Sequence, residues 1–299
     1  MSKKVIISGG SGFLGSRLSE VLLTNGFSVV SLDMQPPQVA GVSYVEANIL
    51  KPLPQHELLR EPYAVVNLAG KNIFGRWTEE HKRLIYDTRV AGTRNLIALF
   101  QHARFRPQVL VSASAVGAYG DRGGELLTEE SSWGDDFLAR VVRDWEDAAQ
   151  EATAHGVRVV CIRNGHILGS TGGMVPVLAP YYRWGVGGSL GMGDQFFPWV
   201  HIDDCVALYL RAITTHSMQP IRNAVAGNPI TNREFSRSFA RAMRRPHVFK
   251  IPKWALRFRY GEFADAMTSS QRVTSLYTRN FRFTDIESAL QDVLKDKKK

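Results

Sequence analysis

The sequence contains little cysteine and no apolar run long enough to cross a membrane. Two cysteines in 299 residues, Cys161 and Cys205, exclude a framework of several disulfide bonds. Both lie in apolar surroundings and neither has a partner at metal-site spacing, so we expect reduced structural thiols and no bound metal. Lys3 and Lys4 precede an apolar run of only strand length, which is not typical of a secretory signal. These absences predict a cytoplasmic protein with no membrane partner.

Negative charge is scarce in the last third of the chain. From residue 211 to 299, 18 Lys and Arg stand against 7 Asp and Glu, whereas the first 210 residues carry a slight negative excess. Such a basic segment attracts anions of several kinds. No nucleic-acid-binding motif accompanies it, so we expect no nucleic-acid partner.

The chain is organised around a glycine-rich turn close to its start. An apolar run over residues 5–8 breaks into Gly9 and Gly10 and continues with the periodicity of a helix. In dinucleotide-binding βαβ units, such glycines allow the tight turn, let the backbone approach a pyrophosphate and let the helix pack on the strand. The helix N-terminus then offers free N–H groups to the phosphates. The cofactor contacts predicted at this turn are Gly9, Gly12, Phe13, Leu14 and Gly15.

A carboxylate follows the second predicted strand. Residues 27–32 form an apolar run that ends at Asp33, about twenty residues beyond the glycines, where a carboxylate binds the adenosine ribose hydroxyls. A carboxylate repels the 2′-phosphate of NADP. Asp33 therefore predicts NAD as the preferred cofactor, with NADP as the alternative.

Strand and helix patterns alternate through the first half of the chain, which is typical of a Rossmann-like α/β fold with a doubly wound parallel sheet. Ligands of such folds lie at the carboxyl ends of the strands. Residues that follow the expected strands are therefore predicted to contact the dinucleotide. They are Asn48, Ile49, Leu68, Ala69, Gly70, Ser112 and Arg163.

The composition changes after Gly169. Residues 170–194 are rich in glycine, proline and aromatic side chains, and we expect a mobile substrate loop there. Helices are predicted at 232–243 and 286–294. The sequence thus predicts a Rossmann domain and a smaller, mostly helical substrate domain. The Rossmann domain covers residues 1–169 and 197–226, and the substrate domain covers residues 170–196 and 227–299.

Ordered motifs along essentially the whole chain carry a resemblance to a known family. After the glycine turn come Asn67-Leu68-Ala69-Gly70, Ser112-Ala113-Ser114-Ala115, Trp145-Glu146, Gly172-Gly173-Met174 and Trp199-Val200-His201-Ile202-Asp203-Asp204. The chain resembles the extended short-chain dehydrogenase/reductase superfamily. Within it, the chain is most similar to the "epimerase family protein" branch, which is like nucleoside-diphosphate-sugar epimerases and carries a C-terminal domain of unknown function. The resemblance implies a homodimer that pairs through two long helices, here those expected at 79–101 and 136–151.

The usual catalytic pair of that superfamily is missing. Active members place a Tyr four residues before a Lys on the helix after the serine loop, and here Leu138 and Val142 occupy those positions. Neither side chain transfers protons. The resemblance places Ser114 at the family's catalytic serine, and Tyr119 on the same loop is the candidate proton donor. Lys71 is an alternative source of the missing positive charge.

The second ligand is predicted to be an anionic small molecule. Arginines offer planar, permanently charged groups suited to phosphate, and aromatic rings offer a stacking surface for a base or sugar. The loop at 185–193 and the basic C-terminal third are expected to cover the carboxyl ends of the strands, and the third is densest at Arg244, Arg245, Arg257 and Arg259. Phe196, Phe197 and Trp199 are expected to supply the stacking surface. The alternative is that these arginines lie on the solvated outer faces of surface helices.

Three functions fit these features. The first, implied by the resemblance, is an NAD(P)-dependent epimerase/dehydratase-like oxidoreductase acting on a nucleotide sugar or similar substrate. The second is a non-catalytic NAD(P)-binding sensor or regulatory protein, which the replacement of Tyr and Lys keeps open. The third is a basic interaction module, against which the cofactor fingerprint and the glycine-rich loop argue.

Overall fold

The computed structural model describes residues 2–218, 220–277 and 281–295. Its central sheet has seven parallel strands in the order β3-β2-β1-β4-β5-β7-β12. β2 and β3 lie on one side of β1, and β4, β5, β7 and β12 lie on the other side. The order in which strands are added therefore reverses between β1 and β4, which is the switch point of a doubly wound sheet. The predicted Rossmann-like α/β fold is confirmed. The strands are β1 (Lys4–Ser8), β2 (Ser28–Asp33), β3 (Ser43–Glu46), β4 (Ala64–Asn67), β5 (Val109–Ala115), β7 (Arg158–Asn164) and β12 (Ile221–Ala224).

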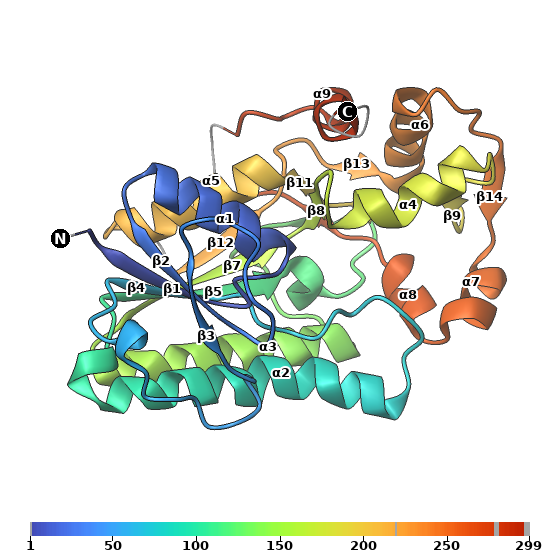
Figure 1. Cartoon of the computed structure of the whole chain (residues 1–299). Helices are drawn as coiled ribbons and strands as arrows, with labels where there is room; N and C mark the ends of the chain where they lie inside the picture. The colour runs from blue at the N-terminus through green and yellow to red at the C-terminus, as the bar shows by residue number, and fades with distance from the viewer. Residues whose placement is uncertain (1, 219, 278–280, 296–299) are drawn as a thin grey trace.

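Helices cover both faces of the sheet (Figure 1). α1 (Phe13–Thr24) and α5 (Ile202–Thr214) pack on one face, and α2 (Glu79–Ala98) and α3 (Phe137–Gln150) lie side by side on the other. Strands covered on both faces read as continuous apolar runs, which explains the pattern seen in the sequence. The two long helices are present where the sequence predicts them.

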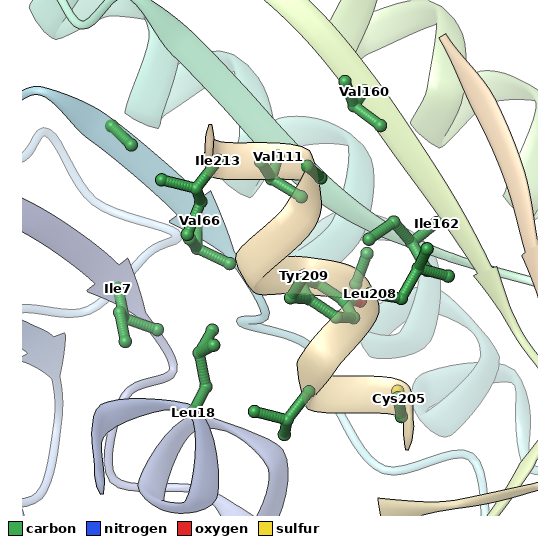
Figure 2. Packing of buried hydrophobic residues seen from close by; sticks show 14 of the residues in the cluster. Ile7, Leu18, Val66, Val111, Val160, Ile162, Cys205, Leu208, Tyr209 and Ile213 are labelled. Atoms are coloured by element: carbon green, nitrogen blue, oxygen red, sulfur yellow. The ribbon is translucent and has the colours of Figure 1, made fainter. Parts of the chain in front are cut away.

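The main core lies between the sheet and the pair α1 and α5. Figure 2 shows Leu208, Tyr209 and Ile213 of α5 facing strand residues such as Val111, with Leu18 of α1 beside them. These side chains are almost wholly buried. The burial of each apolar side chain contributes about 1.5–3 kcal/mol to folding, so this core stabilises the packing of α1 and α5 on the sheet.

The two cysteines belong to the cores. Cys161 and Cys205 are buried free thiols, and burial raises the pKa of both. They therefore stay protonated and unreactive.

The C-terminal part of the chain has a separate core at one end of the sheet, built around Phe197, Phe235, Phe239 and Leu290. The predicted helices at 232–243 and 286–294 are confirmed to within one residue. The helices and strands of this C-terminal part are β8 (His166–Leu168), α4 (Met174–Arg183), β9 (Gly188–Leu190), β10 (Phe196–Phe197), β11 (Trp199–His201), β13 (Ile230–Thr231), α6 (Asn232–Ala242), β14 (Phe249–Ile251), α7 (Lys253–Tyr260), α8 (Phe263–Met267), β15 (Arg272–Val273) and α9 (Ile286–Lys295). β15 pairs with β6 (Leu126–Leu127).

The prediction of a loop at 170–194 is wrong, because this segment contains α4 and β9. Val175, Ala179 and Tyr182 form a buried face at helical spacing. Their burial outweighs the cost of Pro180 inside the helix. The composition of the segment concealed this periodicity.

No helix among the described residues is both long and apolar enough to cross a bilayer.

Candidate cofactor and active site

The glycine turn lies at the carboxyl end of β1, beside the switch point. Gly12 precedes α1 and carries no side chain to bond the first-turn N–H groups, which are therefore available to an anion. A Cβ atom on Gly12 would meet only the Gly9 carbonyl oxygen, at 3.2 Å, so this side of the turn is open. A Cβ atom on Gly15 would lie 2.4 Å from the same oxygen, so Gly15 lets α1 pack closely on the turn. The turn fits a pyrophosphate.

The ring of Phe13 packs against the segment that follows β8. Cβ atoms on Gly169 and Gly172 would lie 2.5 Å and 2.3 Å from ring atoms of Phe13, so larger residues do not fit there. Leu14 packs against the main core. Both side chains therefore hold α1 in place, and the main-chain N–H groups are the parts of these residues that suit a phosphate.

Asp33 ends β2 next to the glycine turn. Its carboxylate accepts hydrogen bonds from the main-chain N–H of Ser11 at 3.0 Å and of Met34 at 2.7 Å. These bonds fix the carboxylate beside the turn, as the predicted ribose contact requires.

The loop after β3 is held beside Asp33. The Ala47 N–H donates to the Asp33 carbonyl oxygen at 2.9 Å. Asn48 caps its own loop by accepting from the Leu50 N–H, and the Ile49 carbonyl accepts from Asn95 of α2 at 2.9 Å. The expected adenine contacts thus lie in a loop anchored to both β2 and α2.

The turn after β4 lies directly against the glycine turn. The Leu68 N–H donates to the Ser8 carbonyl at 2.9 Å, and a Cβ atom on Gly9 would lie 2.9 Å from the Ala69 nitrogen. The structure therefore brings Leu68, Ala69 and Gly70 together with Gly9 at one edge of the sheet.

Arg89 of α2 reaches this edge. Its guanidinium lies within 3.3–3.5 Å of where a Cβ atom on Gly70 would be, and it donates to the Lys71 carbonyl at 2.9 Å. The Trp145 ring centroid is 5.2 Å away. No carboxylate pairs with Arg89 among the described residues, and burial lowers the pKa of Arg89 to about 10. A half-buried guanidinium without a counterion favours an incoming anion or hydroxyl.

Leu138 and Val142 lie on α3 as the sequence places them. Leu138 is half-buried and packs close to Gly117, where an added Cβ atom would lie 3.4 Å from the Leu138 Cβ. Val142 is 3% exposed. Trp145, the partner of Arg89, follows Val142 by one helical turn.

Ser114, Tyr119 and Arg163 belong to one buried hydrogen-bond network. The Ser114 hydroxyl donates to Glu146, and Arg163 donates to both Glu146 carboxylate oxygens at 2.8 Å and 2.9 Å. Arg163 Nη1 also donates to the Tyr119 hydroxyl at 3.1 Å, and that hydroxyl donates to Asn223 at 2.7 Å. Each of these five residues is at most 4% exposed. Ser112, on the same strand as Ser114, donates to the Ala113 carbonyl.

The network fixes the charges of its members. Burial acts to lower the pKa of Arg163, but the bonds and charge of Glu146 raise it above the ordinary value. Burial raises the pKa of Tyr119, although Arg163 opposes this. Arg163 therefore stays charged, and Tyr119 keeps its proton at neutral pH.

Glu146 and Asn223 were not among the residues predicted from the sequence. Glu146 carried two signals: it belongs to the Trp145-Glu146 motif, and it lies four residues after Val142 on the buried side of α3. A carboxylate on such a stripe needs a buried partner. Asn223 gave no signal, because its contact with Tyr119 joins residues 104 apart in the sequence.

The prediction that three aromatic residues form a stacking surface for the ligand is wrong for two of them. Phe197 and Trp199 are 8% and 2% exposed and belong to the C-terminal core. Phe197 stacks on His166 with centroids 4.3 Å apart, and burial lowers the pKa of His166 to about 4. These rings are used for packing.

Known proteins share both the sequence and the fold of this chain. A sequence profile of the NAD dependent epimerase/dehydratase family matches residues 5–226. Epimerase family protein YfhF of Bacillus subtilis is 34% identical over 303 residues, covering 98% of this chain and 99% of YfhF. The crystal structure of human epimerase family protein SDR39U1 (isoform 2) with NADPH has a TM-score of 0.86 at 28% identity, covering 98% of this chain and 99% of that one. MoeE5 in complex with UDP-glucose and NAD shares the fold, with a TM-score of 0.78 at 16% identity over 99% of this chain and 100% of MoeE5.

Proposed function

Because the chain belongs to the NAD-dependent epimerase/dehydratase family, we propose that it binds a nicotinamide dinucleotide and transfers hydride between it and an anionic substrate. The observation that carries the proposal is the open side of the turn at Gly12, beside the carboxylate of Asp33 and the turn at Ala69. Main-chain N–H groups of α1 hold the pyrophosphate, and Asp33 holds the adenosine ribose. The cofactor, when bound, accepts or returns the hydride.

Asp33 makes NAD(H) the proposed cofactor in preference to NADP(H). Its carboxylate accepts from both ribose hydroxyls and repels a 2′-phosphate. We expect the Asp33→Ser variant to lose this discrimination, so that the ratio of NADPH to NADH affinity rises about tenfold, or ~1.4 kcal/mol. Calorimetric titration of both cofactors measures the ratio. An unchanged ratio would show that Asp33 does not read the ribose.

Ser114 is the group proposed to exchange a proton with the substrate. Its own proton is directed to Glu146, so its oxygen accepts a substrate proton while Glu146 takes the serine proton. Tyr119 is fully buried and accepts a hydrogen bond from Arg163, whose guanidinium donates to both carboxylate oxygens of Glu146. Tyr119 is thus a positioning residue in this proposal.

Removing these hydroxyls is expected to slow turnover and to leave cofactor binding intact. Ser114→Ala loses the proton acceptor, and we expect kcat to fall about 100-fold, the lower end of general acid–base effects. Tyr119→Phe weakens the support of Arg163, and we expect a loss of about tenfold with an altered pH profile. Steady-state kinetics and NADH titration check both. Unchanged kcat in both variants would exclude the pair from the mechanism.

Arg89 is proposed to supply the positive charge that the lysine of the family would supply. Its guanidinium lies beside Gly70 in the turn after β4, and it contacts Trp145, which follows Val142 by one turn of α3. Lys71, the alternative predicted from the sequence, is exposed. Arg89 is therefore better shielded from water to hold a ribose hydroxyl or a substrate anion.

The substrate is proposed to be a nucleotide-linked sugar or a similar anion. The support is the basic C-terminal third and the shared fold of a protein that binds UDP-glucose, the latter a fold-level analogy only. We expect UDP- or GDP-linked sugars to raise the melting temperature of the NADH-bound protein, and salt to diminish the rise. A response to neutral sugars alone in the same thermal-shift screen would exclude an anionic substrate.

A non-catalytic NAD(P)-binding role is the second candidate, and the apolar side chains of Leu138 and Val142 and the burial of Tyr119 favour it. The two roles differ in one observable. An enzyme oxidises bound NADH when a suitable carbonyl compound is added, and a sensor leaves the NADH absorbance unchanged.

Two further predictions concern assembly and location. We expect a homodimer that pairs through α2 and α3, which light scattering tests. We expect a cytoplasmic location, which cell fractionation tests.

A further inference from the structure

A cationic pocket of about 210 Å³ lies in the C-terminal part of the chain, between α6, β9 and β14. β14 pairs with β9 so that Lys250 lies opposite Ser189, and α6 packs across β9. In Figure 1, α6, β9 and β14 lie at the right-hand edge of the molecule, with α4 between them and α1. None of the residues that line the pocket belongs to the glycine turn or to the buried network around Arg163.

Positive charge dominates the pocket. Arg233 and Arg237 are four residues apart on α6 and so share one face, and Lys250 comes from β14. Arg233 pairs with Asp194 at 2.6 Å, while its Nε atom is buried without a hydrogen-bond partner. Within the described ranges, neither Arg237 nor Lys250 has an ion-pair partner. Three permanent cations therefore face a single carboxylate.

Two neutral hydrogen-bonding groups complete the pocket. The Ser189 hydroxyl is 3.1 Å from His247 Nε2, and Ser189 is 1% exposed. Burial, and then the charge of Arg237, lower the pKa of His247 below its ordinary value. The positive field that disfavours a proton on His247 is the field that attracts an anion.

We propose that this pocket is a second anion site, which binds a phosphate group carried by a small molecule. Arginine and lysine side chains without partners, beside a hydroxyl and an imidazole, match the acceptor oxygens of a phosphate. The volume is below the roughly 300 Å³ at which pockets begin to enclose whole drug-sized ligands, so it suits a phosphate group and part of its carrier. Phe249, 48% exposed at the rim, offers an apolar surface to a nucleoside.

The test is calorimetric titration of pyrophosphate and of UMP into the full-length protein saturated with NADH, repeated without NADH. Saturation fills the cofactor site, and the repeat makes the result independent of whether NADH binds. The pocket variant is Arg237→Gln with Lys250→Gln. The matched control is Arg83→Gln with Arg104→Gln, which removes the same charge from two exposed arginines outside the C-terminal part of the chain.

We expect the pocket variant to bind about tenfold more weakly than the wild type and the control to bind unchanged. If the pocket variant loses affinity for both UMP and pyrophosphate, the phosphate belongs to a nucleotide. If it loses affinity for pyrophosphate alone, the site binds a phosphate group without recognising a nucleoside. Absence of binding to the wild type, or equal binding by both double variants, would overturn the proposal. We expect the pocket variant to bind NADH with the affinity of the wild type, which would show that this site is separate from the cofactor site.

Discussion

Replacing Glu146 by glutamine is expected to cost about 3–5 kcal/mol of unfolding free energy, the penalty for removing one partner of a buried ion pair. Both side chains of the Glu146–Arg163 pair are 5% exposed, and two hydrogen bonds join them. The glutamine is of similar shape, so packing changes little. What changes is that Arg163 is left as an uncompensated charge inside the protein. Urea denaturation of both proteins measures the difference.

The matched control is Glu151→Gln, which breaks the pair between Glu151 and Arg94. Those side chains are 48% and 53% exposed, so we expect a loss below about 1 kcal/mol. Converting both Glu146 and Arg163 to neutral residues is expected to recover part of the lost stability. Equal losses in Glu146→Gln and Glu151→Gln would contradict the assignment of Glu146 and Arg163 as a buried pair.

Two alanine substitutions in the glycine turn are expected to separate cofactor binding from folding. In Gly12→Ala the new methyl group meets only the Gly9 oxygen, at 3.2 Å, and it occupies the side of the turn that a pyrophosphate approaches. We expect a loss of NADH affinity on the order of 100-fold, or ~2.7 kcal/mol, with little change in stability. NADH titration and urea denaturation measure the two effects.

Gly15→Ala is expected to act on folding instead. Its methyl group would lie 2.4 Å from the Gly9 oxygen and 2.7 Å from the Gly10 Cα, both main-chain atoms. Moving α1 away from the turn costs about 1–3 kcal/mol of stability. A Gly12→Ala variant that binds NADH as tightly as the wild type would show that the pyrophosphate does not approach this side of the turn.

The fold and the outline of the cofactor site were predictable because their signals are local. The apolar run over 5–8, the glycines that follow and the carboxylate at Asp33 lie within one βαβ unit, where spacing alone predicts position. The family was predictable for a different reason, since its ordered motifs extend over the whole chain. The profile match over residues 5–226 confirms it.

The partners of the site residues were not predictable in the same way. Arg163 meets Glu146 and Tyr119 only once α3, β5 and β7 are packed, and Arg89 meets Trp145 only because α2 lies against α3. α4 was missed because proline and glycine obscured an amphipathic face that only tertiary burial makes decisive. Helix spacing shows which residues share a face, and packing decides which of those faces lose contact with water.

We expect the glycine turn and Asp33 together to bind a nicotinamide dinucleotide with a preference for NAD(H). Calorimetric titration of the wild-type protein with NADH and with NADPH, under identical buffer and salt, tests it most directly. We expect one site per chain for each cofactor and NADH binding at least about tenfold tighter than NADPH, or ~1.4 kcal/mol. Tighter binding of NADPH, or no binding of either cofactor, would contradict it.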